Sequence, residues 1–525
     1  MQDASKNGSG GIWKVIWASS AGTMIEWYDF YIFGILAVTL STAFFPESSK
    51  GLMQTLGIFA AGFIVRPFGA IFFGRIGDVI GRKYTFLLTL VLMGGSTCGI
   101  GLLPTYATAG FVAPLLLLAL RLIQGLALGG EYGGAATYIA EHAPDGRRGF
   151  YTSFIQTTAT LGLFVALGVL LGVRSALKES EFADWGWRIP FLLSAVLVVF
   201  SYAIRRKMAE SPLFARLKAE GKTSVNPIKE SFGNPVNRKL VLLALFGATA
   251  GQGVVWYTGQ FYALYYLQTV LHVSMTSSYF VMAIALMLGT PFFIVFGSLS
   301  DRIGRKKIIV TGCIVAALLY VPIYAGMVHA TDIKTFNTGG AAPFVKVDHQ
   351  TDPKTGDSLT VTTTITDSEE GRVTEKDTDR IPAKPGAAKP KVDHKTEITL
   401  GGPIMFVLSL LILLQVLFVT MVYGPIAAFL VELFPTRIRY TSMSLPYHIG
   451  NGVFGGLVPL IGKSLEGSID PHYGGLAYPI GIALMTAFIG GFFIHEKRDV
   501  KLWDEPPDLA PPDLPDRSDL KSQPD

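Results

Sequence analysis

The sequence predicts an all-α membrane protein in which twelve transmembrane helices form two pseudo-symmetric six-helix bundles. A small extracytoplasmic insertion, which can contain β-strands, is expected in the second half. Three observations lead to this prediction: two motifs occur twice, half of the residues are apolar, and basic residues follow alternate apolar segments.

The two motifs are repeated in the same order along the chain. Residues 74–83 (GRIGDVIGRK) return as residues 297–306 (GSLSDRIGRK), and residues 141–147 (EHAPDGR) return as residues 432–437 (ELFPTR). The first pair is 223 residues apart and the second pair 291. A duplicated membrane unit whose second copy carries an insertion of 68 residues explains both separations. Such repeats are typical of membrane transporters.

The composition excludes an ordinary soluble protein. Apolar residues make up 50% of the chain and charged residues 16%, against about 25% charged residues in a soluble domain. A span needs roughly 20 mostly apolar residues to cross about 30 Å of hydrocarbon. Twelve segments meet this requirement, near residues 13–41, 52–73, 84–104, 111–140, 150–173, 188–205, 239–267, 276–297, 307–328, 403–425, 440–463 and 474–494.

The positions of lysine and arginine predict the orientation of these spans. Basic residues follow the second, fourth, sixth, eighth and tenth spans, whereas the loops on the other side are short or mixed in charge. Because cytoplasmic loops are enriched in lysine and arginine, both termini are expected on the cytoplasmic side of a bacterial inner membrane. The net charge of +5 then reflects membrane topology and not nucleic-acid binding.

The predicted domains follow from the spans and the linkers. They are an N-terminal bundle (1–205), a central cytoplasmic loop (206–238), a C-terminal bundle (239–495), an insertion between the ninth and tenth spans (329–400) and a disordered cytoplasmic tail (496–525). Residues 361–366 of the insertion, and the paired segments 346–349 and 391–394, alternate as short β-strands do, so a small hairpin is expected, followed by a flexible Pro-rich segment at 382–390.

The sequence gives little support for a metal site. The tetrapeptide KVDH occurs at residues 346–349 and 391–394 of the insertion, but no cysteine and no compact ligand spacing accompany it. Cys98 and Cys313 both lie within predicted spans. No metal and no cofactor are therefore expected.

Six motifs resemble the major facilitator superfamily and, within it, the metabolite:proton symporter family. They are residues 26–31 (EWYDFY), 66–69 (RPFG), 74–83, 121–134 (RLIQGLALGGEYGG), 185–190 (WGWRIP) and 432–439 (ELFPTRIR). The resemblance covers every segment except the insertion and the tail. It implies an alternating-access carrier that imports a small organic acid together with protons.

The resemblance also implies that the repeated loops form a cytoplasmic gate. Asp78 and Asp301 can cap helix starts, and the basic residues of each loop can pair with Glu141 and Glu432 at neighbouring helix ends. A plain topology signal is the alternative interpretation. The predicted gate residues are Gly74, Asp78, Gly81, Arg82, Lys83, Glu141, Asp301, Arg302, Gly304, Arg305, Glu432 and Arg437. Val79 departs from the superfamily pattern, which usually has a basic residue there, as the second copy has at Arg302.

Four charged residues within the spans are candidates for proton coupling: Glu26, Asp29, Arg121 and Glu131. A charge at mid-bilayer costs about 2.5–3.5 kcal/mol on the insertion scale, so such residues usually face a cavity and pair. A carboxylate that leaves an arginine in a dry cavity takes up a proton. Proton-coupled sugar porters of the superfamily carry an acid on span 1 and an arginine on span 4, which assigns coupling to Asp29 and Arg121. A static ion pair is the alternative, and for Glu26 and Glu131 both interpretations stay open.

Solute-binding residues are expected from both halves near the midplane. The candidates are Tyr28, Tyr31, Arg121, Gln124, Gln156, Gln252, Trp256, Tyr257, Gln260, Tyr447, His448 and Asn451, with Tyr132 and Gln415 as further polar positions. Arginines in the cavity favour an anionic or zwitterionic solute, because guanidinium groups match carboxylates. Arg66 fits helix packing as well as an anion site.

The predicted solute is a mono-, di- or tricarboxylate, and the alternative is an osmolyte such as betaine or proline. The osmolyte ranks second because the tail lacks the heptads of the family's osmosensing member. A drug/proton exporter is disfavoured, because residues 150–173 lack the Gly-Pro kink usual in superfamily antiporters. No grouping of His, Cys or Ser suggests an enzyme, and no output domain suggests a sensor. The expected partners are the solute, protons and the lipid bilayer, with no nucleic acid, and the chain is expected to be a monomer.

Overall fold

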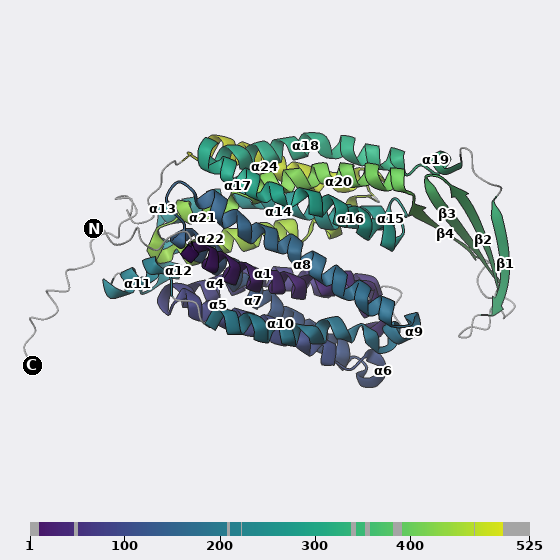
Figure 1. Cartoon of the computed structure of the whole chain (residues 1–525), viewed down its shortest axis with the longest axis horizontal. Coiled ribbons are helices and arrows are strands. Elements are labelled where there is room, and N and C mark those ends of the chain that lie inside the picture. Colours follow the sequence, from purple (N-terminus) through teal and green to yellow (C-terminus); the bar gives the residue numbers. More distant parts are fainter. Residues whose placement is uncertain are drawn as a thin grey trace, which may run out of the picture.

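The computed structural model describes residues 10–46, 51–206, 210–221, 223–337, 343–351, 358–381, 391–466 and 468–496. Long helices run side by side along one axis, and a β-sheet projects beyond one end of them (Figure 1). We call this the sheet end. The opposite end, where α11 (Pro212–Ala219) and α12 (Pro227–Gly233) lie, is called the gate end.

The first half contains six predicted spans, and two of them are broken. Val15–Ile35 and Ala37–Phe44 are bent by 59° relative to each other. A second break follows Ile64, where Pro67 occupies the first turn of the next helix and cannot donate a backbone hydrogen bond. The elements are α1 (Gly10–Ile35), α2 (Ala37–Phe44), α3 (Gly51–Ile64), α4 (Arg66–Val79), α5 (Arg82–Leu102), α6 (Tyr106–Ala109), α7 (Val112–His142), α8 (Arg148–Ala176), α9 (Glu179–Glu181), η1 (Phe182–Gly186) and α10 (Arg188–Arg206).

The second half repeats this arrangement with more irregular helices. Its elements are α13 (Pro235–Ala244), η2 (Leu245–Thr249), α14 (Ala250–Tyr257), η3 (Thr258–Tyr262), α15 (Ala263–Thr269), α16 (Met275–Gly289), α17 (Pro291–Ile303), α18 (Arg305–Ala330), α19 (Ile333–Asn337), α20 (Gly402–Tyr423), α21 (Ile426–Leu433), η4 (Thr436–Ile438), α22 (Arg439–His448), η5 (Ile449–Gly455), α23 (Val458–Glu466), η6 (Gly474–Leu476) and α24 (Ala477–Phe493). The π-helical η2, η3 and η5 interrupt two of the spans.

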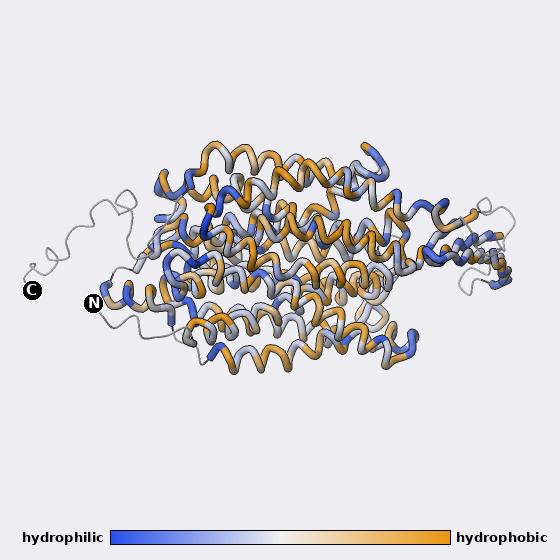
Figure 2. The backbone as a smooth tube through the Cα atoms, turned by 45° about the horizontal axis from the view of Figure 1, so that its top comes forward, coloured by the Kyte–Doolittle hydropathy of each residue, from blue (hydrophilic) through white to orange (hydrophobic). Residues whose placement is uncertain are grey.

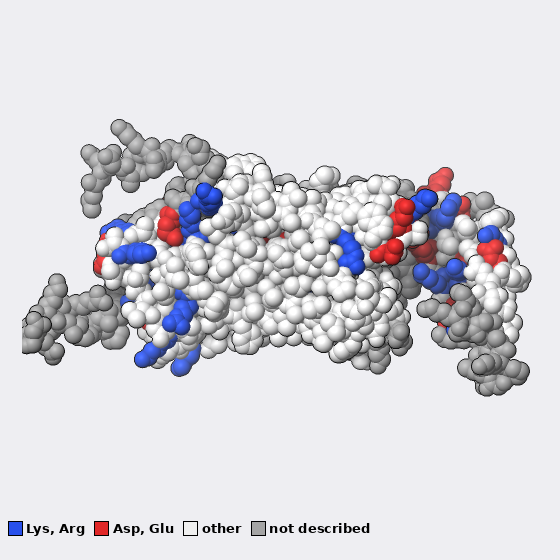
Figure 3. All heavy atoms as spheres, turned by 90° about the horizontal axis from the view of Figure 1, so that it is seen from below, with Lys and Arg blue, Asp and Glu red and all other residues white. Residues whose placement is uncertain are grey.

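Ten helices in the described ranges are long and apolar enough to cross a membrane, and the bent pair α1/α2 makes up to eleven. The predicted span at 440–463 does not pass this test, because α22 is polar and η5 separates it from α23. Its polar residues Thr441, Ser442 and Ser444 are buried between helices, which explains why the segment can be polar. Hydrophobic residues dominate the long helices and hydrophilic ones the two ends (Figure 2). One face of the molecule shows charged side chains gathered at both ends of a broad uncharged band (Figure 3).

The predicted β-structure of the insertion is confirmed, and it is a four-stranded antiparallel sheet, which is larger than the expected hairpin. Its strands are β1 (Phe344–Thr351), β2 (Ser358–Ser368), β3 (Gly371–Ile381) and β4 (Lys391–Leu400), in the order β1-β2-β3-β4. The predicted flexible segment 382–390 lies outside the described residues. Ile398 joins the sheet to the bundle, since it exchanges backbone hydrogen bonds of 2.8 Å with His272 and Ser274.

The two histidines of the repeated tetrapeptides lie on the two edge strands. His349 contacts the Thr360 hydroxyl at 3.2 Å, and His394 contacts the Asp377 carboxylate at 2.6 Å. The hydrogen bond to Asp377 raises the pKa of the exposed His394. No group of three or more potential metal ligands occurs within the described ranges.

Candidate transport site and gate

Asp78, near the end of α4, lies against the start of α22 in the opposite half. Its Oδ2 atom accepts hydrogen bonds from the Thr441 backbone nitrogen at 2.9 Å and from the Thr441 hydroxyl at 2.7 Å. Gly74 makes this approach possible, because a Cβ atom there would lie 3.1 Å from the Thr441 Cα. The carboxylate therefore caps the first turn of α22, where unpaired amides and the helix dipole favour a negative charge.

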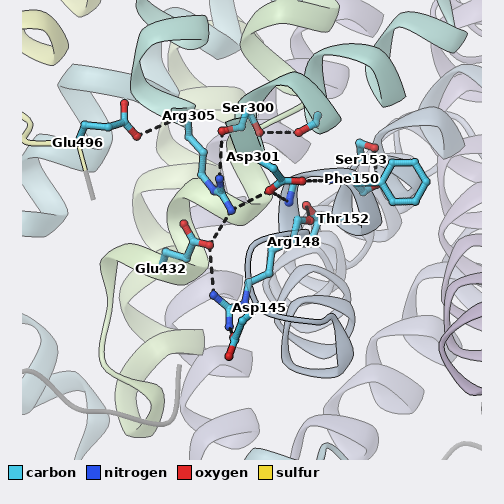
Figure 4. Close-up of polar contacts among 12 residues, drawn as sticks. Asp145, Arg148, Phe150, Thr152, Ser153, Ser300, Asp301, Arg305, Glu432 and Glu496 are labelled. Atoms are coloured by element: carbon cyan, nitrogen blue, oxygen red, sulfur yellow. Dashed lines mark hydrogen bonds and ion pairs between the residues drawn. The ribbon is translucent and has the colours of Figure 1, made fainter. Parts of the chain in front are cut away.

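Asp301, near the end of α17, makes the equivalent contact in the reverse direction. Its two oxygens accept hydrogen bonds from the backbone nitrogens of Gly149 and Phe150, each at 2.8 Å, at the start of α8 (Figure 4). Each copy of the repeated motif thus caps a helix of the other half. These two symmetry-related contacts join the halves at the gate end.

A cluster of ion pairs borders the first capping contact. Arg82 pairs with Glu141 at the end of α7, and Glu141 also accepts from Arg439 Nη1 of the other half at 3.1 Å. Arg82 Nη2 donates to the Thr436 carbonyl, also of the other half, at 3.2 Å. Glu141 therefore holds cations from both halves.

The second capping contact has a matching cluster (Figure 4). Glu432 Oε1 lies 2.7 Å from Arg305 Nη2 of its own half and 3.4 Å from Arg148 Nη1 of the first half. Arg305 also lies 3.1 Å from Asp301. Glu432 therefore pairs with arginines of both halves, as Glu141 does in the first cluster.

The other predicted gate residues divide into those that take part and those that do not. Gly81 and Gly304 start α5 and α18 with φ of 146° and 107°, a backbone conformation that favours glycine. The Lys83 backbone nitrogen donates to Glu210 at 3.3 Å, and Arg437 lies 3.1 Å from Glu230. Arg302 is exposed.

The departure at Val79 therefore has no consequence for the two clusters. Val79 is 42% exposed, and its counterpart Arg302 is exposed as well. Neither position points into the contact between the halves. The strength of the first loop's contact depends on Asp78 and Arg82, which are both buried.

Asp29 and Arg121 are both buried, but no direct ion pair joins them in this state. Asp29 accepts a hydrogen bond from the Ser194 hydroxyl of α10. Arg121 Nη1 donates to Gln124 Oε1 at 2.8 Å, and Gln124 Nε2 donates to the Thr97 hydroxyl at 2.7 Å. The Thr97 hydroxyl itself donates to the Met93 carbonyl at 2.9 Å, and Asp29 Oδ2 has no hydrogen-bond partner within the described ranges. In this state Asp29 and Arg121 therefore belong to separate sets of hydrogen bonds.

Glu26 and Glu131 share one cation that the sequence interpretation missed. Arg205 of α10 donates from Nη1 to Glu26 at 2.6 Å and from Nη2 to Glu131 at 3.0 Å. Its guanidinium also lies 3.6 Å from the centre of the Phe86 ring. Thr23 adds a hydrogen bond to Glu131 at 3.3 Å. All three charged side chains are at most 3% exposed, so two carboxylates face one guanidinium away from water.

Arg66 and Arg121 are two further buried charged groups, and both are positive. Their guanidinium carbons lie 4.9 Å and 5.2 Å from the centre of the same ring, Phe30 of α1. Both line one cavity of about 10 Å³, which has room for about one water molecule. Neither has a carboxylate partner among the residues that the structure describes.

Aromatic and amide side chains from both halves meet beside these arginines. Tyr132 of α7 stacks on Tyr447 of α22 with ring centres 3.5 Å apart, and the Gln156 amide donates to the Tyr132 hydroxyl at 2.7 Å. Trp27 and Trp256 lie 5.3 Å apart across the same boundary. We call these side chains, together with their neighbours described next, the central cluster. Both halves contribute residues to it, as the symmetry of the repeat predicts.

Further predicted residues lie in this cluster. The Tyr31 hydroxyl contacts Gln260 at 3.5 Å, and the amides of Gln252 and Asn451 exchange hydrogen bonds of 3.1 Å and 2.8 Å. Several buried polar atoms have no hydrogen-bond partner within the described ranges: Gln156 Oε1, Trp256 Nε1, Tyr257 Oη, Gln260 Nε2, Gln415 Oε1 and both ring nitrogens of His448. Unpaired buried polar atoms are costly and are candidates for contact with a solute.

One predicted binding residue does not join the cluster. The Tyr28 hydroxyl donates to the Pro190 carbonyl at 2.6 Å and so holds α1 against α10. Four residues that contact the predicted ones were not predicted from the sequence: Thr97, Ser194, Arg205 and Tyr423. Tyr423 donates or accepts at 2.7 Å with the Tyr447 hydroxyl.

The fold and the paired gate loops define a transporter of the major facilitator superfamily. The structure of the proton:xylose symporter XylE from E. coli, at 18% identity, aligns with a TM-score of 0.65 over 94% of this chain and 98% of that chain. The chain belongs to the family of sugar (and other) transporters, whose family model matches residues 14–344. The predicted superfamily and fold class are confirmed, and the chain is a multi-pass membrane transporter and not an enzyme.

Two curated relatives from E. coli (strain K12) differ in solute. The alpha-ketoglutarate permease is 31% identical over 490 residues, which cover 93% of this chain and 94% of the permease. The proline/betaine transporter is 33% identical over 339 residues, which cover 62% of this chain and 66% of that protein.

We predict that Asp301→Asn loosens the gate end. The substitution weakens two charge-assisted hydrogen bonds to α8, and about 1.4 kcal/mol shifts an equilibrium tenfold. In a background without Cys98 and Cys313, the alkylation rate of a cysteine replacing the buried Ser153 should rise about tenfold. Arg302→Gln, at the exposed neighbouring position of α17, is the matched control and should leave the rate unchanged. Equal rates in both variants would contradict the assigned contact.

We predict that Arg205→Gln strongly destabilises the protein. Removing one partner of a buried ion pair costs about 3–5 kcal/mol, because the remaining charges lose their compensation. Thermal unfolding of the purified protein in detergent should show a clear drop in midpoint temperature. Arg206→Gln removes the exposed neighbour of Arg205 and should have no effect. The neutral triple variant Glu26→Gln/Arg205→Gln/Glu131→Gln should regain stability, and an unstable triple variant would contradict the explanation by charge.

Proposed function

We propose that this transporter imports a small organic acid together with protons across the bacterial inner membrane. The observation that carries the proposal is the pair of buried arginines, Arg66 and Arg121, which have no carboxylate partner among the described residues. Isolated charges are expensive to bury, and they are usually paired. A carboxylate solute would supply the missing negative charge.

The surroundings of the two arginines support a solute with more than one polar group. Arg66 and Arg121 line the same small cavity, which has room for only about one water molecule in this state, so two carboxylates of one molecule would each meet a guanidinium once the site opens. The unpaired atoms of Trp256, Gln260 and His448 come from the other half and can contact the remainder of the solute. We therefore place a dicarboxylate first among organic acids.

Proton coupling is assigned to Asp29. In the present state this acid is hydrogen-bonded to Ser194 and not paired with Arg121, which suits a protonated carboxyl in a buried site. When the gate end opens, movement of α7 relative to α1 would bring Arg121 to Asp29 and displace the proton. The cluster of Glu26, Glu131 and Arg205 has one more acid than base, so it can hold a second proton.

The orientation follows from the basic loops. The gate end carries Arg82, Arg305 and their neighbours, so we place it and both termini in the cytoplasm. The closed contacts at this end then correspond to a state in which the cytoplasmic side is shut. The gate residues act as a latch that must release before the solute leaves.

A zwitterionic osmolyte is the second candidate solute. The identity of 33% to the proline/betaine transporter favours it. A betaine or proline carries one carboxylate and one cation, so it would compensate only one of the two arginines and would add a positive charge. The two buried guanidiniums therefore favour the organic acid.

The two candidates can be separated in proteoliposomes with an imposed pH gradient, acidic outside. We expect protonophore-sensitive uptake of a labelled dicarboxylate, with little uptake of betaine or proline. Arg66→Gln and Arg121→Gln should each raise the half-saturation concentration for the dicarboxylate about tenfold or more, because each removes a charge-assisted hydrogen bond of about 1.5–3 kcal/mol. A monocarboxylate should be affected strongly by only one of them.

The control for this experiment is Arg372→Gln, an exposed residue of the sheet, which should transport as the wild type does. Uptake of betaine in preference to every carboxylate would contradict the proposal. So would unchanged dicarboxylate kinetics in both arginine variants.

A further inference from the structure

A groove at the gate end lies outside the transport site, between α13 and the end of α24. It has a volume of about 330 Å³ and is lined by Pro235, Arg238, Lys239, Leu242, Leu243, Phe246 and Ile489. Its two basic residues lie on the first turns of α13, where the membrane span Pro235–Thr269 begins. Its remaining lining is apolar.

The basic residues of this groove have no acidic partner among the residues that the structure describes. Arg238 and Lys239 are both exposed, and no ion pair joins either of them to another described residue. The nearby Glu230 of α12 is taken by Arg437 at 3.1 Å. Within the described part of the chain, the groove entrance therefore keeps two uncompensated positive charges.

The groove opens on the surface that faces the hydrocarbon of the bilayer. Leu242 of α13 is 49% exposed, and Phe488 and Phe492 of α24 are 59% and 75% exposed. Side chains of this kind meet lipid chains in a membrane protein. The basic residues lie at the end of these apolar helices, at the level where phospholipid headgroups begin.

We propose that this groove binds a phospholipid with an anionic headgroup. The lipid phosphate would lie between Arg238 and Lys239, and one acyl chain would follow Leu242, Leu243, Phe246 and Ile489 into the groove. Basic pockets between membrane helices on the cytoplasmic side suit such headgroups. Charge and apolar surface thus occur in the order that a phospholipid requires.

The groove also contacts the part of the second half that holds the central cluster. Phe246 belongs to η2, and its ring lies 6.1 Å from that of Phe454 in η5. Gln252 lies in α14, which directly follows η2, and Asn451 lies in η5. The amides of these two residues are paired. A bound lipid would therefore brace the two irregular segments against each other, and its binding does not depend on which solute is transported.

The test uses the purified full-length chain in detergent and native mass spectrometry with added lipids. Phosphatidylglycerol and cardiolipin should remain bound more strongly than phosphatidylcholine. Arg238→Gln/Lys239→Gln should lower the affinity for phosphatidylglycerol about thirtyfold, which corresponds to about 1 kcal/mol for each basic residue. Lys218→Gln/Lys307→Gln removes two exposed charges from the same end and should leave the affinity unchanged. Leu243→Trp, which fills the groove without a change of charge, should also lower it.

Three outcomes would overturn the proposal. Equal retention of phosphatidylglycerol by the wild type and by Arg238→Gln/Lys239→Gln would exclude a headgroup site there. Displacement of the lipid by millimolar inorganic phosphate would show that the groove recognises phosphate alone. Unchanged lipid retention, together with a charge-dependent protection of residues 504–525 from protease, would show that the acidic tail is the occupant.

Discussion

Asp301 accepts two backbone hydrogen bonds from the start of α8, and Asp78 makes the same kind of contact with the start of α22. Each carboxylate belongs to one half and caps a helix of the other, so these two acids join the halves at the gate end. Glu141 and Glu432 stabilise this arrangement, because each neutralises arginines from both halves. The closed state therefore depends on charge compensation between the two copies of one repeat.

The need to compensate buried charges also explains how the centre of the molecule would bind a solute. Buried arginines at the gate find carboxylate partners in their own half and in the opposite half, whereas Arg66 and Arg121 have none within the described part of the chain. A carboxylate solute would meet this need only while it is bound. The buried acids nearby are held by neutral hydroxyls or by the shared Arg205, so they can gain a proton at a smaller cost than an acid that is fully paired. In this account, solute and proton bind to neighbouring but separate charged groups of the first half.

Much of this arrangement can be predicted from the sequence. The repeat identifies Asp78, Asp301, Glu141 and Glu432, because the same acidic residues occur at equivalent positions in both halves of the chain. Arg205 is harder to find, since it ends a span beside Arg206 and so resembles a topology signal. The spacing of polar residues does indicate that Arg205 is buried. Ser201 lies seven residues after Ser194 and Arg205 four residues after Ser201, so all three share one buried face of α10. The separate hydrogen bonds of Asp29 and Arg121, and the pairing of the insertion's strands into one four-stranded sheet, depend on side-chain positions and on contacts between distant residues, which one sequence does not reveal.

If Asp29 exchanges a proton as the pathway changes sides, Asp29→Asn should separate solute binding from proton-driven uptake. In proteoliposomes, this variant should no longer concentrate the organic acid when a pH gradient is imposed, yet it should still exchange labelled for unlabelled solute at equal concentrations. Asp379→Asn, at an exposed position of β3, should do both. If the Asp29→Asn protein still accumulates solute against a gradient, the proton is carried by another group and the account of coupling fails.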